Sequence, residues 1–218
     1  MKSKYKIIKS LAEVYKKSNP STYFVNNKSF KQHNNGRKKL LLNLKLPPKL
    51  FKNSTLIDFG SGSGQNTISY DNLGASCTLV EYDKKSCKNS KVLFKKFSKN
   101  KYKIINKDIY KYKSAKKFDF VVSHGVIHHT ENIKKTINIC SSALKKGGFL
   151  ILSTGEQHGF FQRNIQRLIL YKISKNQKEI FKYAKILFKD HLKRSTKFGG
   201  RSINEIISDT YLNPKINT

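Results

Sequence analysis

A glycine-rich turn is the most chemically informative feature of the sequence. Gly60-Ser61-Gly62-Ser63-Gly64 follows the short apolar run Leu56–Phe59 and precedes a stretch with helical periodicity. Glycine lets the backbone turn tightly and approach a ligand, and the start of a helix offers unpaired N–H groups. A phosphate-binding P-loop would need Lys followed by Ser or Thr after its last glycine, where this chain has Gln65-Asn66, so that class is excluded. A dinucleotide fingerprint needs its third glycine one place later, so G-x-G-x-G preceded by Asp58 is a different pattern.

Five motifs in chain order resemble those of class I S-adenosylmethionine-dependent methyltransferases. Asp58–Gly64 is similar to the family's D-x-G-x-G-x-G turn, and Glu81 stands 17 residues after Gly64, at the end of the second apolar run. The other three motifs are Asn106–Ile109, Phe118–His129 and Leu144–Ile151. The resemblance covers residues 55–154. It implies a Rossmann-like α/β fold, a doubly wound parallel sheet with strand order 3-2-1-4-5, and S-adenosyl-L-methionine as cofactor.

The resemblance also implies which residues contact that cofactor. Glu81 matches the acid that accepts from the ribose hydroxyls, with Asp83 as the rival, and Tyr82 could lie on the adenine face. Asp108 matches the acid that holds adenine, although helix capping is its alternative role. Asp58 is expected to orient the turn and the cofactor's amino group. The expected cofactor-binding set is Asp58, Gly60, Ser61, Gly62, Gly64, Glu81, Tyr82, Asp108, Ile109, Ser123 and His124.

Three histidines follow the fourth apolar run, and they allow more than one interpretation. His124 and His128 have the His-x-x-x-His spacing of a metal site on a helix. They lie, however, at the exit of an expected strand, with no cysteine or acidic triad nearby, so lining of the substrate cavity or packing is favoured and no metal is expected. His128 and His129 are the candidate catalytic bases, because imidazole titrates near neutral pH and a hydroxyl or protonated amine acceptor must lose a proton.

Alternating apolar runs and helical stretches position these residues. The expected strands are 56–59, 78–82, 103–106, 118–123 and 149–153. The expected helices between them are 65–73, 84–98 and 133–145. Strands separated by helices predict a parallel sheet, and ligands of such sheets lie beyond the carboxyl ends of the strands, where the candidate residues fall.

The flanking segments are expected to be helical. Residues 1–54 predict an N-terminal helical cap, with helices over 1–18 and 37–46 and a polar stretch over 26–36 between them. Residues 155–218 predict a helical segment on the substrate side, with helices over 160–175 and 178–193. The family's strands six and seven have no convincing counterpart there. A C-terminally truncated chain is favoured over replacement of those strands by helices.

The composition is strongly basic, with 45 Lys and Arg against 13 Asp and Glu in 218 residues, a net charge of +32. The charge is spread along the whole chain and only five of the cations are Arg, whose fork suits phosphate, so a compositional bias is favoured over a dedicated nucleic-acid surface. The three cysteines are widely spaced and odd in number, which argues against a disulfide framework. With no secretory signal and no long apolar run, the expected location is cytoplasmic.

Together these features predict an enzyme that transfers a methyl group from S-adenosyl-L-methionine to a small-molecule acceptor. The alternative is an RNA methyltransferase or an inactive nucleic-acid-binding relative, because aromatic residues lie among the cations of residues 160–193. The amphipathic lid remains the favoured role for that segment. Residues 123–126 also supply no aromatic or Asn-Pro clamp for a flipped base.

Overall fold

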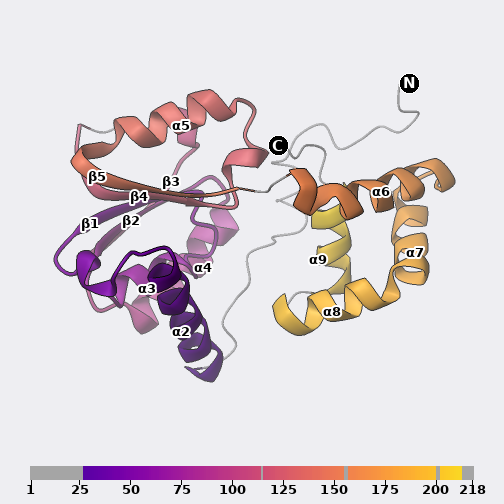
Figure 1. Ribbon diagram of the computed structural model, residues 1–218, viewed down its shortest axis with the longest axis horizontal. Helices are drawn as coiled ribbons and strands as arrows, with labels where there is room; N and C mark the ends of the chain where they lie inside the picture. The colour runs from indigo at the N-terminus through magenta and orange to yellow at the C-terminus, as the bar shows by residue number, and fades with distance from the viewer. Residues whose placement is uncertain (1–26, 114, 155–156, 200–201, 213–218) are drawn as a thin grey trace. The chain divides into compact units, whose positions relative to one another are not determined.

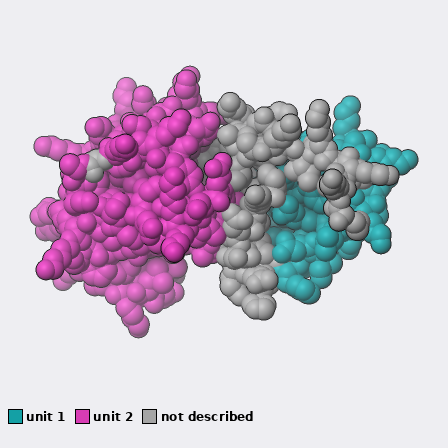
Figure 2. Space-filling view, turned by 90° about the horizontal axis from the view of Figure 1, so that it is seen from above, with its two compact units in different colours: residues 1–22, 155–218 teal, residues 23–154 magenta. Residues whose placement is uncertain are grey.

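The chain is described by a computed structural model that covers residues 27–113, 115–154, 157–199 and 202–212. It divides into two compact units (Figure 2). One unit contains the described residues up to Thr154, and the other contains the described residues after it. The part of the expected N-terminal cap that the structure describes therefore belongs to the same unit as the sheet. The helix expected over residues 1–18 lies outside the described residues.

The first unit is built on a five-stranded parallel sheet with strand order β3-β2-β1-β4-β5 (Figure 1), which confirms the predicted topology. Its strands are β1 (Thr55–Phe59), β2 (Ser76–Glu81), β3 (Tyr102–Asn106), β4 (Phe118–His124) and β5 (Leu144–Ser153). The predicted strands lie within one to two residues of these bounds, except that β5 begins five residues earlier than expected. Residues 144 and 145 thus belong to the strand and not to the preceding helix.

Side chains of successive strand residues pack on opposite faces of the sheet, as the period of two requires. On one face Leu56, Leu79 and Phe120 pack with residues of α2 (Asn27–Asn43), α3 (Thr67–Asp71) and α4 (Lys84–Phe97). On the other face Ile57, Val80 and Val121 pack with α5 (Ile133–Ser142), which covers that face in Figure 1. Because both faces are covered, the central strand β1 is buried at every residue after its first.

Helix α2 differs from the prediction at its start. The polar stretch 26–36 was expected to be non-helical, but the helix already begins at Asn27 and runs through Gly36. Tertiary contacts explain the difference, because the Phe30 ring stacks on Phe97 at 3.9 Å between centroids and Ser69 donates to the Asn34 side chain. These contacts hold a segment whose own apolar periodicity is weak.

Short helices complete the unit. They are η1 (Pro48–Phe51), η2 (Ile109–Lys111) and η3 (Ile127–His129), of which η2 and η3 follow the carboxyl ends of β3 and β4. Asp119, near the start of β4, accepts from Thr55 at the start of β1 and from Lys145. It therefore lies at the opposite edge of the sheet from the glycine turn and outside the candidate site.

The second unit is helical. It consists of α6 (Gln157–Ile173), α7 (Gln177–Leu187), α8 (Lys189–Gly199), α9 (Ile203–Ile207) and the short π-helix η4 (Ser208–Leu212). The single helix predicted over 178–193 is wrong, because Phe188 leaves the helical region and its ring packs against Tyr211. No strand occurs among residues 157–199 and 202–212.

Candidate active site

The glycine turn connects β1 to α3 at the carboxyl edge of the sheet, and its glycines have backbone angles that other residues rarely adopt. Gly60, Gly62 and Gly64 have φ values of +75°, +56° and +77°. A Cβ on Gly60 would lie 2.5 Å from Val126, and one on Gly64 would lie 3.0 Å from both Leu79 and Phe94. The turn is therefore packed on one side by the loop after β4 and on the other side by β2 and α4. At Gly60 and Gly64 it has room only for glycine.

Glu81, the last residue of β2, holds the middle of this turn. Its Oε2 accepts from the Gly62 N–H at 2.7 Å and its Oε1 accepts from the Asp83 N–H at 2.8 Å. Burial raises the pKa of Glu81, and the two backbone N–H donors oppose that rise. The N–H of Tyr82 also acts on this carboxylate, and its two oxygens together have more acceptor sites than these three donors occupy.

The rival acid, Asp83, is used differently. Its Oδ2 accepts from the backbone N–H and the hydroxyl of Ser86, so it caps the N-terminus of α4. Of the two acids, Glu81 is the one whose carboxylate is bonded to the glycine turn.

Two buried oxygens beside the turn have no hydrogen-bond partner among the described residues. They are Asp58 Oδ1 and Ser61 Oγ. Asp58 is only 2% exposed, and its other oxygen, Oδ2, accepts from the Thr67 hydroxyl at 2.6 Å. Burial raises the pKa of Asp58 to about 7; the Thr67 hydrogen bond and the Arg37 charge act against that rise. Buried oxygens are normally paired, so this pair marks a place where a ligand would supply a donor.

The remaining expected cofactor contacts surround the same edge. Tyr82 is 52% exposed directly after Glu81. Asp108 caps η2 through its Oδ1, which accepts from the Tyr110 N–H. Ile109, half-buried, is the first residue of η2 and packs against the core beside α5. Ser123 is buried and donates to the Phe59 carbonyl, which ties the ends of β4 and β1 together.

His124 ends β4 in a cluster that sequence reasoning missed. Its Nε2 lies 2.9 Å from the Arg37 guanidinium of α2 and 2.9 Å from the Tyr70 hydroxyl of α3, and its ring stacks over Tyr70. Burial and the Arg37 charge lower the pKa of His124 to about 3, so the ring is neutral at physiological pH. One signal could have found Arg37, because it is one of only five arginines in a lysine-rich chain and only a guanidinium offers a planar fork of donors.

The two candidate bases lie on η3. The His128 and His129 rings are 4.0 Å apart between centroids, and His128 Nδ1 lies 3.4 Å from the Thr154 hydroxyl. Val126, next to η3, is the residue that packs on Gly60, so the loop carrying both histidines lies against the glycine turn. No group of three or more His, Cys, Asp or Glu side chains within the described ranges is placed to hold a metal ion. Cys77, Cys87 and Cys140 are free and buried.

The arrangement fits an adenosyl cofactor that carries an amino-acid tail. The sheet edge offers a carboxylate at Glu81 for hydroxyl donors and a buried unpaired oxygen at Asp58 for an ammonium group. The tight turn lets the backbone approach such a ligand closely.

No helix in the described part of the chain is long and apolar enough to cross a membrane.

Comparison with known proteins identifies the family. A family model described as "Methyltransferase domain" matches residues 31–206, most of the chain. A ubiquinone biosynthesis O-methyltransferase of Pelagibacter ubique (strain HTCC1062) is 33% identical over 107 residues, which are 49% of this chain and 44% of that protein. The chain thus aligns with less than half the length of this curated relative.

Solved methyltransferase structures are also similar. A magnesium protoporphyrin IX methyltransferase from Synechocystis PCC 6803 matches with 18% identity and a TM-score of 0.49, covering 66% of this chain and 68% of that one. An S-adenosylmethionine-dependent methyltransferase from Thiobacillus denitrificans matches with 20% identity and a TM-score of 0.45, covering 52% and 47%. With its sheet order, its glycine turn and the family match over residues 31–206, the chain belongs to the class I S-adenosylmethionine-dependent methyltransferases.

Proposed function

We propose that the protein transfers a methyl group from S-adenosyl-L-methionine to the hydroxyl group of a small-molecule acceptor. The observation that carries the proposal is the pair of buried, unpartnered oxygens, Asp58 Oδ1 and Ser61 Oγ, beside a turn whose middle is bonded to Glu81. These groups lie at the carboxyl edge of a parallel sheet, where such folds bind their ligands.

The chain's own residues would hold the cofactor by complementary hydrogen bonds. Glu81 would accept from the ribose hydroxyls through its free lone pairs, and Asp58 would accept from the ammonium group of the methionine moiety. Asp108 Oδ2 would accept from the adenine amino group while Oδ1 goes on capping η2. Tyr82 and Ile109 would flank the adenine ring. The turn residues Gly60, Gly62 and Gly64 would let the backbone approach the ligand.

When bound, S-adenosyl-L-methionine supplies the methyl group and a neutral thioether leaving group for an in-line displacement. The protein's contribution is to align the acceptor oxygen with that methyl group and to exclude water. A hydroxyl acceptor loses its proton as the new O–C bond forms, and a base must take that proton. His128 or His129 would take it. His124 is unsuited, because its lowered pKa of about 3 makes it a weak base.

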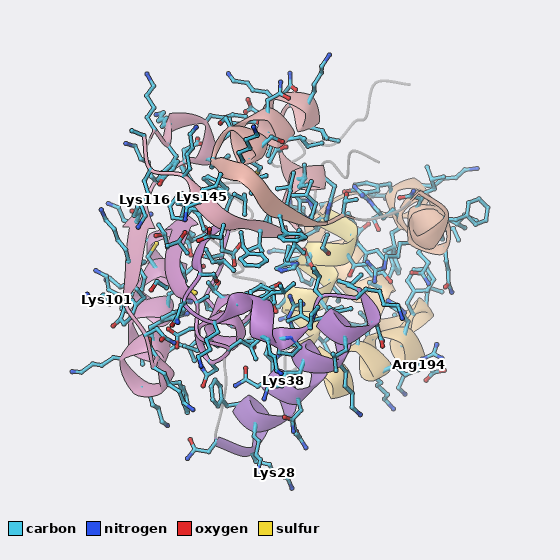
Figure 3. All side chains as sticks on the ribbon, turned by 60° about the vertical axis from the view of Figure 1, so that its left-hand side comes forward. Lys28, Lys38, Lys101, Lys116, Lys145 and Arg194 are labelled. Atoms are coloured by element: carbon cyan, nitrogen blue, oxygen red, sulfur yellow. The ribbon has the colours of Figure 1, made fainter. Side chains whose placement is uncertain are left out.

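Two observations support a small hydroxylic acceptor. The aligned relative is named as an O-methyltransferase of ubiquinone biosynthesis, and the 107 matched residues amount to half of this chain. The lysines of the first unit that Figure 3 labels, moreover, do not gather on one element. Lys28 and Lys38 lie on α2, Lys101 and Lys116 precede β3 and β4, and Lys145 lies on β5. A dedicated polyanion surface would concentrate them on one face.

The test is a methyl-transfer assay with radiolabelled S-adenosyl-L-methionine. The acceptors are 3,4-dihydroxybenzoate, a panel of other phenols, and total RNA. We expect label on a phenol, its loss in Glu81→Gln, and its retention in the matched control Glu131→Gln, which changes an exposed glutamate. Label on RNA alone would contradict the proposal. Full turnover of both His128→Ala and His129→Ala, with cofactor binding intact, would contradict the assignment of the base.

A further inference from the structure

The turn that carries the two proposed catalytic histidines is held on both sides. On one side Val126 packs against the glycine turn. On the other side the carbonyl of Ile127, the first residue of η3, accepts from the Thr130 hydroxyl at 2.6 Å. His128 and His129 lie inside the turn that this hydrogen bond closes. The position of the Thr130 hydroxyl therefore influences the position of both imidazole rings.

A chain of hydrogen bonds extends from Thr130 to a tyrosine on another loop. The buried Thr136 of α5 donates from its Oγ1 to Thr130 Oγ1 at 3.0 Å. Thr136 Oγ1 also lies 3.1 Å from the hydroxyl of Tyr110, which belongs to η2. The Tyr110 hydroxyl in turn accepts from the Asn132 N–H at 3.0 Å. Hydroxyl groups of η2, of α5 and of the turn after η3 thus connect the first of these elements with the last.

The hydrogen bonds of this chain run in one direction. A hydroxyl has one proton to donate, and Thr130 uses its proton on the Ile127 carbonyl, so its oxygen is the acceptor for Thr136. Thr136 then accepts the proton of Tyr110. The Asn132 carbonyl lies 2.9 Å from Thr136 Oγ1, but it already accepts the Thr136 N–H in the first turn of α5. Hydrogen bonds that follow one another in this way polarise and strengthen each other.

Helix α5 does not need the tyrosine hydroxyl for its own start. Its N-cap, Asn132, accepts from the Lys135 N–H at 2.8 Å, which satisfies a donor of the first turn. The Lys135 ammonium lies 5.2 Å from the centre of the Tyr110 ring, a further contact between η2 and α5. What the Tyr110 hydroxyl adds is a connection to the segment before the helix, where the histidines lie.

We propose that Tyr110 is a positioning residue, which holds the histidine turn in the geometry for proton transfer through Thr136 and Thr130. In that step His128 or His129 takes the hydroxyl proton of the acceptor while the acceptor oxygen bonds to the methyl carbon and the carbon–sulfur bond breaks. A general base must lie within hydrogen-bond reach of the proton that it takes, so a small displacement of its ring slows the step. The inference rests on the proposed function, because the base belongs to that reaction.

Initial-rate kinetics with two phenols separate positioning from support of the fold. 3,4-Dihydroxybenzoate must lose a hydroxyl proton during methyl transfer, whereas 4-nitrocatechol is already ionised at one hydroxyl in mildly alkaline buffer. We expect Tyr110→Phe to lower kcat for 3,4-dihydroxybenzoate on the order of 10-fold and kcat for 4-nitrocatechol by less than about threefold. The affinity for S-adenosylhomocysteine, measured by calorimetry, should stay unchanged.

Matched variants serve as controls. Tyr112→Phe removes a hydroxyl from the same segment, where the ring packs edge-on against Phe59, and should change neither rate. Thr136→Val interrupts the chain in its middle and should reproduce the pattern of Tyr110→Phe, whereas Thr136→Ser keeps the hydroxyl and should retain the wild-type rates. Once the histidine that acts as the base is replaced by Ala, Tyr110→Phe should have no further effect, because it acts through that ring.

The remaining outcomes overturn the inference. If Tyr110→Phe slows both phenols equally, or slows neither, the tyrosine only supports the fold, and the proposed function stands. If Tyr110→Phe does not fold, the same comparison between Thr136→Val and Thr136→Ser decides. If the wild-type protein methylates neither phenol, the inference fails, and the other phenols and RNA of the methyl-transfer assay show whether the proposed function fails with it.

Discussion

Replacing Asp58 with Asn should remove a pH dependence that this one carboxyl imposes on the folded protein. The carboxyl is buried at the end of β1, and burial raises its pKa from 3.8 to about 7, against the opposing influence of Thr67 and Arg37. Asn keeps the oxygen that accepts from the Thr67 hydroxyl, but it cannot ionise. The variant therefore removes the ionisable group of Asp58 while leaving the size of the side chain almost unchanged.

The sign and size of the effect follow from the two pKa values. Because the folded state binds the proton more tightly than the unfolded state does, the stability that Asp58 contributes is fully present below pH 3.8. It is lost as the pH rises through about 7. A difference of about three pKa units corresponds to about 4 kcal/mol at 1.36 kcal/mol per unit, which sets the maximum loss.

Urea unfolding at several pH values between 4 and 8 measures this loss. The free energy of unfolding of Asp58→Asn minus that of the wild type should increase across this range by up to about 4 kcal/mol. Titration with S-adenosylhomocysteine should show the opposite pH dependence, because the affinity of the wild-type protein should be higher at higher pH. An ammonium group favours the ionised carboxylate, so wild-type affinity should fall by up to about tenfold for each pH unit below 7.

Other groups near Asp58 should not reproduce this pattern. Burial lowers the pKa of both His33 and His124, in each case with help from Arg37, and both rings are present in the two proteins, so their titration cancels in the difference. Glu81 has a raised pKa too, but it is present in both proteins and cancels in the difference. Identical pH profiles for the wild type and Asp58→Asn, in stability and in binding, would refute the reasoning.

Three further predictions concern the turn and its support. Gly64→Ala should lower the free energy of unfolding by about 2–4 kcal/mol in urea melts, because it combines a φ of +77° with crowding against Leu79 and Phe94. Gly147→Ala is the control, with a φ of +78° and nothing within 4 Å, and should cost about 1–2 kcal/mol; equal losses would disprove the crowding. Asp71→Ala should cost about 2–4 kcal/mol in the same melts, because Ser98 Oγ and the N–H groups of residues 99 and 100 all donate to this carboxylate. A loss of unfolding free energy below about 1 kcal/mol would show that water takes the place of the Asp71 carboxylate. Glu81→Gln should weaken S-adenosylhomocysteine and 5′-methylthioadenosine equally in calorimetry, by about tenfold, since both carry the ribose; selective weakening of one would contradict the ribose contact.

The sheet was predictable from sequence because its signal is local. Strands buried on both faces are short apolar runs, and helical stretches between them require a parallel arrangement. The tight turn at Gly60, Gly62 and Gly64 could also be predicted, because residues other than glycine rarely adopt the positive φ values that these three have. Glu81 could be placed at a strand end in the same way.

Contacts between segments that are distant along the chain could not be predicted from the sequence in this way. The first turns of α2 are polar and depend on packing against Phe97 and Ser69, about 35 to 67 residues away along the chain. The break at Phe188 depends on Tyr211 of η4. Arg37 was missed as a site residue for the same reason, because only the folded chain brings it to His124, 87 positions later.

The crystal structure of the protein with S-adenosylhomocysteine is the most direct test of the account. The ligand should lie at the carboxyl edge of the sheet, with its ribose hydroxyls within hydrogen-bond distance of Glu81 and its ammonium group on Asp58 Oδ1. A ligand bound elsewhere, or one that leaves both carboxylates without contact, would contradict the central claim.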